Sequence, residues 1–161
     1  MSAAHAMAFD DRSLDRSDQL PLPPPLSPAA RQLFDQASRA LAEASGCTDA
    51  RQRYATAHLA ALRAAAAVLA ARTHPEPGRR RPRSAWVLLE QVAPELGEWA
   101  AFFASGAPKR AAAEAGLPAV TAREADDLVR DVAAFLVVVE QALGGAPRPR
   151  PHVVGSSRNR T

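Results

Sequence analysis

Residues 48–72, TDARQRYATAHLAALRAAAAVLAAR, form the longest strongly helical stretch of the sequence. Ala is the best helix former, and neither Gly nor Pro interrupts this run. Apolar and ring-bearing residues recur in it at intervals of three and four, which places them on one side of an α-helix. They are Tyr54, His58, Ala61, Leu62, Ala65, Val68 and Leu69. Because alanines let a neighbouring helix approach closely, we expect this helix at the centre of a bundle.

The composition is that of an all-α domain. Hydrophobic residues make up 47% of the 161 residues, whereas aromatic residues make up only 5%. The β-branched and aromatic residues that strands favour are therefore sparse, while Ala is abundant. Arg far outnumbers Lys, which occurs once, as is typical of proteins from GC-rich bacterial genomes. The single Cys excludes an intramolecular disulfide and fits a reducing cytosol.

Capping signals mark the first two helices. Ser27 followed by Pro28 predicts a helix start, and Gly46 predicts its end. Thr48 is the expected N-terminal cap of the central helix, with Asp49 in the first turn. Only three residues separate the two helices, so we expect them to pack antiparallel.

The second half of the chain carries further helix signals. Ser84 is the expected cap of a third helix, which Pro94 either kinks or divides into two segments. A short helical segment is predicted over residues 108–115, with Gly116 as its stop. Thr121 and Glu124 have the spacing of a capping box and open the last helix.

These signals together predict an up-down bundle of four or five helices over residues 27–143. We interpret its aromatic residues as core packing rather than as base-stacking platforms; they include Trp86, Trp99, Phe102 and Phe103. Residues 1–26 are predicted to be a disordered, proline-rich leader. Residues 144–161 are predicted to be a disordered tail whose four Arg and absent acids make it basic.

Several function classes lack their sequence signatures. No CxxC, HExxH, GxSxG, Walker or GxGxxG pattern occurs. Four acidic residues cluster on the last helix, but no His accompanies them, so we interpret them as a solvated face: Glu124, Asp126, Asp127 and Asp131. We expect no metal and no cofactor. Without a signal-like N-terminus or a run of 18 apolar residues, the sequence predicts a cytoplasmic protein that does not enter a membrane.

One group of residues has the chemistry needed for catalysis. Arg51 and Arg53 precede His58 with six and four residues between them. On a helix, seven positions return Arg51 to within about 20° of His58, whereas five place Arg53 about 140° away. Arg51 is therefore the better partner for His58, with Tyr54 between them. A His that titrates near neutrality can act as a base on the RNA 2′-OH, and Arg can stabilise the phosphate.

The predicted bundle and the YATAHLAALRAAAA segment with its Arg-x4-6-His spacing resemble the HEPN domains (higher eukaryotes and prokaryotes nucleotide-binding). More narrowly, residues 27–143 are similar to small HEPN proteins of high-GC Gram-positive bacteria. The resemblance implies a four- or five-helix bundle, homodimers, and association with RNA or nucleotides. Many HEPN proteins are metal-independent ribonucleases that use this Arg and His, often as toxins paired with a nucleotidyltransferase.

Three functional hypotheses follow. The first is a HEPN-like binding module, non-catalytic or weakly catalytic, that associates with RNA, a nucleotide or a partner protein. The second is a metal-independent RNA endonuclease that uses His58 and Arg51. The third is a structural accessory bundle without nucleic-acid contact. A basic cluster offers a phosphate or RNA contact, or is an exposed loop in an Arg-rich protein: Arg79, Arg80, Arg81 and Arg83.

Overall fold

The computed structural model describes residues 25–73 and 83–144, and within them it is all-α. The elements are α1 (Pro28–Gly46), α2 (Ala50–Arg72), α3 (Ala85–Val92), the 3-10 turn η1 (Pro94–Leu96), α4 (Gly97–Glu114) and α5 (Ala122–Ala142). The predicted fold class is thus confirmed. All the helices of the described residues fall between residues 27 and 143. The predicted leader and tail lie almost entirely outside the described residues.

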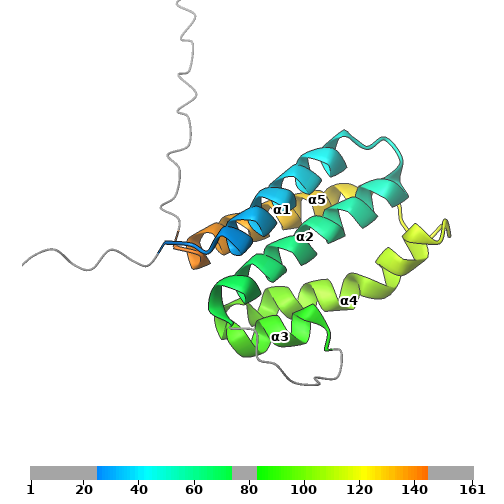
Figure 1. Cartoon of the computed structure of the whole chain (residues 1–161). Helices are drawn as coiled ribbons and strands as arrows, with labels where there is room; N and C mark the ends of the chain where they lie inside the picture. The colour runs from blue at the N-terminus through cyan, green and yellow to red at the C-terminus, as the bar shows by residue number, and fades with distance from the viewer. Residues whose placement is uncertain (1–24, 74–82, 145–161) are drawn as a thin grey trace, which may run out of the picture.

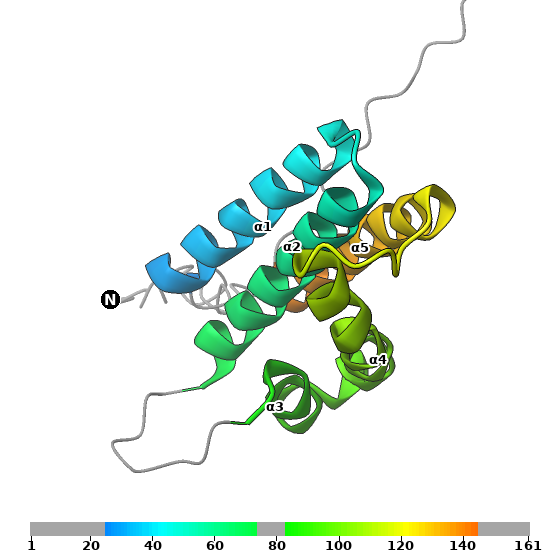
Figure 2. The ribbon, with the colours of Figure 1, turned by 90° about the vertical axis from the view of Figure 1, so that its right-hand side faces the viewer.

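The helix α2 is the centre of the bundle (Figures 1 and 2). It packs against α1, α3, α4 and α5, and α1 lies antiparallel beside it. Its buried residues surround most of the helix, so the predicted single stripe was incomplete. Ala60, Ala64 and Ala67 are fully buried outside that stripe, while Leu62 and Leu69 are partly exposed. Apolar periodicity missed this second face because Ala occurs equally well on buried and exposed sides of a helix.

By length and composition, α2 is also the one helix of the described residues that would be able to cross a membrane. The core helix of a soluble bundle can have the same length and apolar composition. Here the other four helices pack around α2, and the buried His58 lies on it. The fold is therefore compatible with a soluble protein.

The start of α2 differs from the prediction by one residue. Asp49, not Thr48, is the N-terminal cap, and its side chain accepts hydrogen bonds from the backbone N–H groups of Arg51 and Gln52 at 2.7 and 3.2 Å. Two residues able to cap stand side by side here. Asp49 is the cap because its carboxylate reaches two free N–H groups and carries negative charge at the positive end of the helix.

The other caps are those that the sequence predicts. Ser27 accepts a hydrogen bond from Ala30 N at 3.2 Å, and Ser84 accepts one from Trp86 N at 3.3 Å. At α5 the capping box is complete, with both reciprocal bonds between Thr121 and Glu124 present. These bonds satisfy N–H groups that a helix start otherwise leaves without partners.

The prediction of a separate segment over residues 108–115 was wrong. Instead, α4 runs without a break from Gly97 to Glu114, with Pro108 inside it. A proline lacks the N–H for one helical bond and crowds the preceding turn, and α4 changes direction in this region (Figure 2). The residues that follow Pro108 nevertheless keep the helix going because they are mostly Ala.

The heaviest part of the core lies between α3, α4 and α5. The ring of Phe103 is stacked with Trp86 and Trp99, at centroid distances of 5.1 and 5.9 Å, and lies 5.0 Å from Phe135. Phe103 is completely buried, as predicted, and so is Phe135. Phe102, predicted to join them, is 44% exposed because consecutive helical positions point about 100° apart.

Candidate functional site

His58 is buried between α2 and α4. Only 1% of it is exposed, and its Nε2 lies 3.0 Å from the backbone carbonyl oxygen of Phe103. Because a carbonyl only accepts, Nε2 carries the proton and donates it. The other ring nitrogen, Nδ1, is buried without a hydrogen-bond partner among the described residues.

The surroundings of His58 favour the neutral imidazole. Its ring meets Trp86 and Phe103 edge to face, at centroid distances of 5.8 and 6.1 Å. Burial lowers the pKa of His58 below its ordinary value of 6.5, and the bond to the Phe103 carbonyl opposes this shift only in part. The nearby positive charge of Arg110 lowers the pKa further. His58 is therefore uncharged at neutral pH.

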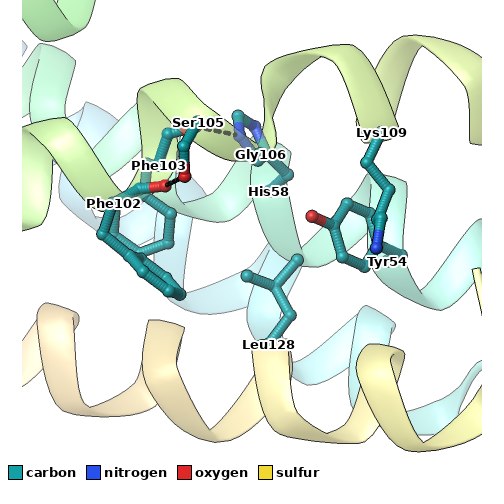
Figure 3. Close-up of a pocket in the computed structure, with 8 residues that line it drawn as sticks. All are labelled: Tyr54, His58, Phe102, Phe103, Ser105, Gly106, Lys109 and Leu128. Carbon is teal, nitrogen blue, oxygen red and sulfur yellow. Dashed lines mark hydrogen bonds between the residues drawn. The ribbon is translucent and has the colours of Figure 1, made fainter.

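A small pocket opens beside His58 (Figure 3). It has a volume of about 190 Å³, and its lining comes from α2, α4 and α5. The residues around it are Tyr54, His58, Phe102, Phe103, Ser105, Gly106, Lys109 and Leu128. The pocket thus combines apolar walls with a phenol, a hydroxyl and an ammonium group.

The absence of a side chain at Gly106 leaves space for the hydroxyl of Tyr54. A Cβ at this position would lie 3.0 Å from Tyr54 Oη and 3.7 Å from His58 Nε2. Tyr54 is itself 7% exposed, and burial raises the pKa of its phenol. The phenol is therefore protonated at neutral pH and able to donate a hydrogen bond.

Lys109 stands at the rim of the pocket and forms an ion pair with Glu124 at the start of α5. The hydrogen bond from Lys109 and those from Thr121 lower the pKa of Glu124 to about 2. The same contact raises the pKa of Lys109. Both groups are consequently charged across the physiological range.

The structure does not bring Arg51 to His58. The guanidinium of Arg51 donates from Nη1 to the carbonyl oxygen of Gly116 at 2.7 Å and pairs with Asp49 at 3.3 Å. His58 is seven residues further along α2, about 10 Å on the helix axis. His58 bonds to Phe103 on α4, whereas Arg51 bonds to Gly116 in the loop after α4. The two side chains therefore contact different segments.

Arg53 also holds a loop in place. Its Nε donates to the carbonyl oxygen of Cys47 at 2.9 Å, its Nη2 donates to that of Thr48, and its Nη1 pairs with Asp126 on α5. Neither Arg51 nor Arg53 lines the pocket that contains His58. Of the residues that share the pocket with His58, Tyr54 was singled out from the sequence, whereas Ser105, Gly106 and Lys109 were not.

A family comparison agrees with this fold. A sequence profile described as HEPN_SAV_6107-like HEPN matches residues 44–140, from the end of α1 to near the end of α5. The chain belongs to this HEPN family. The match confirms the resemblance to small HEPN domains. No curated protein and no solved structure matches the chain.

Of the basic cluster predicted to contact phosphate, three residues lie outside the described part of this HEPN domain: Arg79, Arg80 and Arg81. Arg83 is described and exposed just before α3, where its Nη1 donates to Gln91 Oε1 at 3.3 Å. A phosphate contact by this cluster stays a prediction.

Three of the four acidic residues clustered on α5 form ion pairs. Asp126 pairs with Arg53, Asp127 pairs with Arg123 and Arg130, and Glu124 pairs with Lys109. Within the described ranges, no three His, Cys, Asp or Glu residues gather in a way that could hold a metal ion.

Sequence reasoning missed Ser105, Gly106 and Lys109 because it treated Pro108 as a helix boundary. The available signal was the glycine itself. A Gly inside a long Ala-rich helical run costs stability and usually marks a place where another group approaches closely. Here that group is the Tyr54 hydroxyl.

Proposed function

We propose that this protein is a cytoplasmic HEPN-family module that binds RNA or a nucleotide and does not cleave RNA. The observation that carries the proposal is the position of His58, which is buried in an aromatic environment and donates a hydrogen bond from Nε2 to the Phe103 carbonyl oxygen. A residue held in this way stabilises the packing of α2 on α4.

Cleavage through the 2′-OH makes two demands on the site. A base must lie within hydrogen-bond reach of that hydroxyl, and a cation must lie where the phosphate gains charge. His58 is 1% exposed, and the guanidinium groups of Arg51 and Arg53 are bound to backbone carbonyls. The His and Arg side chains are thus engaged within the fold rather than free for this chemistry, which favours binding over the endonuclease hypothesis.

Binding of a nucleotide or RNA is supported by the pocket beside His58. Lys109 supplies a cation, Phe102 supplies a half-exposed aromatic ring, and Tyr54 supplies a hydroxyl. Proteins bind single-stranded nucleic acid through cations that contact its phosphates and aromatic rings that stack on its bases. A purely structural bundle, the third hypothesis, has no need of such a pocket.

The test is an incubation of the full chain with single-stranded RNA in EDTA, from about pH 5 to pH 9, the range in which general bases titrate. RNA binding is measured in parallel by fluorescence anisotropy. We expect binding without cleavage. Cleavage that is lost in both folded His58→Ala and folded Arg51→Ala proteins, but kept in Arg53→Ala, would instead establish the endonuclease. A protein that neither binds nor cleaves RNA would favour the structural hypothesis.

The partners implied by the family are also proposals. A homodimer is tested by analytical ultracentrifugation across a range of protein concentrations. A nucleotidyltransferase partner is tested by co-expression of the two proteins and co-purification. A strictly monomeric protein would exclude the homodimer. Failure to co-purify with the co-expressed enzyme would exclude the nucleotidyltransferase partner.

A further inference from the structure

We propose that the pocket between α2, α4 and α5 takes one unstacked nucleobase, with the attached phosphate on Lys109. This inference rests on the proposed function and gives the place and chemistry of its ligand. The ligand is a base with a phosphate, supplied either by a free nucleotide or by an unpaired position of single-stranded RNA.

The first observation is the hydroxyl of Tyr54. The residue is 7% exposed, and its Oη makes no hydrogen bond to any residue between 25–73 or 83–144. Figure 3 shows this oxygen directed into the pocket, toward Gly106 and His58. The oxygen is not one of the buried atoms left without a partner, because it opens onto the pocket, where a hydroxyl can both donate to and accept from a ligand. A base edge, which carries both donors and acceptors, is a suitable partner for it.

The second observation is the space at Gly106. A Cβ there would lie 3.0 Å from Tyr54 Oη, closer than ordinary contact, and would fill the end of the pocket. Gly106 adopts no positive φ, so the backbone does not require glycine at this position. The glycine is instead explained by the room that it leaves around the hydroxyl.

The third observation is the pair of groups at the opening. Phe102 is 44% exposed, and its ring is braced by Trp99 and Phe103 at centroid distances of 6.3 and 5.1 Å. A ring fixed in this way offers a stacking partner to a base. Lys109 gives one hydrogen bond to Glu124, which leaves N–H donors for a phosphate oxygen.

The size of the pocket limits the ligand to one ring system. Its volume of about 190 Å³ is smaller than the roughly 300–1,000 Å³ of pockets that enclose drug-sized molecules. Its walls are apolar at Phe103 and Leu128, which suits a flat ring. A double-stranded segment, whose bases remain stacked, has no base to insert.

The experiment is a titration of a labelled short oligoadenylate with the full chain, followed by fluorescence anisotropy. Unlabelled AMP, single-stranded RNA and double-stranded RNA are the competitors. Displacement by AMP identifies a free nucleotide as a sufficient ligand, and displacement by single-stranded RNA alone identifies the strand. Both results support the inference, whereas double-stranded RNA that competes as well as single-stranded RNA would overturn it.

Three variants locate the site without removing the core. Tyr54→Phe deletes only the hydroxyl and should weaken binding about 2- to 10-fold, the worth of one hydrogen bond, with an unchanged Tm. Gly106→Ala should weaken binding because its Cβ takes the space beside Tyr54 Oη, and its Tm is measured alongside, since the higher helix propensity of Ala opposes the cost of that close contact. Phe102→Ala should weaken binding roughly 5- to 150-fold, the range for one lost base–aromatic contact.

Lys109→Met tests the phosphate contact by its salt dependence. Loss of one phosphate contact should flatten the plot of log affinity against log salt by about 0.7 for a single strand. The matched control is Arg39→Met, which removes one exposed positive charge from α1, away from the pocket. Val137→Ala on α5 controls for loss of an exposed apolar residue.

The outcomes separate the two proposals. If the wild-type protein binds RNA and the pocket variants bind like their controls, the inference is wrong and the proposed function stands. If the wild-type protein binds neither RNA nor AMP, both are wrong. Reduced binding confined to the pocket variants, with folding intact by circular dichroism, supports both.

Discussion

His58 Nε2 donates a hydrogen bond to the backbone carbonyl of Phe103, 3.0 Å away, and thereby joins α2 to α4 inside the core. The bond fixes the proton on Nε2 and leaves Nδ1 buried without a partner in the described part of the chain. A proton added at Nδ1 would create a charge among Trp86 and Phe103, where water cannot solvate it. The fold therefore favours the neutral form of this residue.

The first prediction is that stability falls in mild acid. The pKa of His58 is lowered in the folded protein and is ordinary, near 6.5, in the unfolded chain. The unfolded state thus binds more protons below this value, so the free energy of unfolding falls as pH falls from about 7 to about 5. Urea unfolding at a series of pH values measures the slope.

The matched control is His58→Gln, whose amide can still donate to the Phe103 carbonyl but does not titrate in this range. We expect this variant to lose most of the pH dependence between about pH 7 and pH 5. His58→Ala, which also leaves a cavity, should cost about 2–4 kcal/mol at neutral pH. An unchanged pH slope in the Gln variant would show that other groups cause it.

The second prediction compares two adjacent phenylalanines. Phe103 is completely buried and contacts the rings of Trp86, Trp99 and Phe135, so Phe103→Ala should cost about 3–5 kcal/mol. Phe102 is 44% exposed, and Phe102→Ala should cost roughly 1 kcal/mol. Chemical denaturation of both variants measures the difference, and equal losses would contradict this description of the core.

The helix starts could be predicted from the sequence because capping is local. Ser27 with Pro28, and Thr121 with Glu124, satisfy nearby N–H groups whatever the rest of the chain does. The same local reasoning chose Thr48 over Asp49, where two capping residues compete. It also ended a helix before Pro108, where α4 in fact continues.

The candidate site could be predicted only in part. Helical spacing shows that Arg51 and His58 share a side of α2, but it does not show which helix covers that side. The structure places α4 against His58 and the loop at Gly116 against Arg51. The approach of Tyr54 to Gly106 joins residues far apart in the sequence, and no local pattern encodes it.

The third prediction concerns the buried alanines of α1 and α2. The fully buried residues of α1 are all Ala, and Ala64 on α2 is also completely buried. Ala64→Leu adds three carbons where no space exists and should cost about 1–3 kcal/mol. Ala66→Leu, on the partly exposed side of the same helix, should change stability by less than about 0.5 kcal/mol. Thermal unfolding of the two variants makes the comparison, and a tolerated Ala64→Leu would show that the core around Ala64 is loosely packed.

The last prediction concerns Glu124, which serves two partners at once. One carboxylate oxygen completes the capping box with Thr121, and the other pairs with Lys109. Together these contacts lower the pKa of Glu124 from 4.5 to about 2, and the bond from Lys109 is the largest cause. Because the folded pKa is the lower one, the stabilisation is present above pH 4.5 and is lost as pH falls toward 2.

Lys109→Met should therefore raise the pKa of Glu124 but keep it below 4.5, since the bonds from Thr121 remain. Thr121→Ala should raise it less and should also cost about 1 kcal/mol, the usual value of a lost N-terminal cap. Thr121→Ser preserves the hydroxyl and is the control. An NMR titration of the Glu124 side-chain carboxyl carbon measures the three values. A larger rise in Thr121→Ala than in Lys109→Met would show that the cap, rather than the ion pair, sets this pKa.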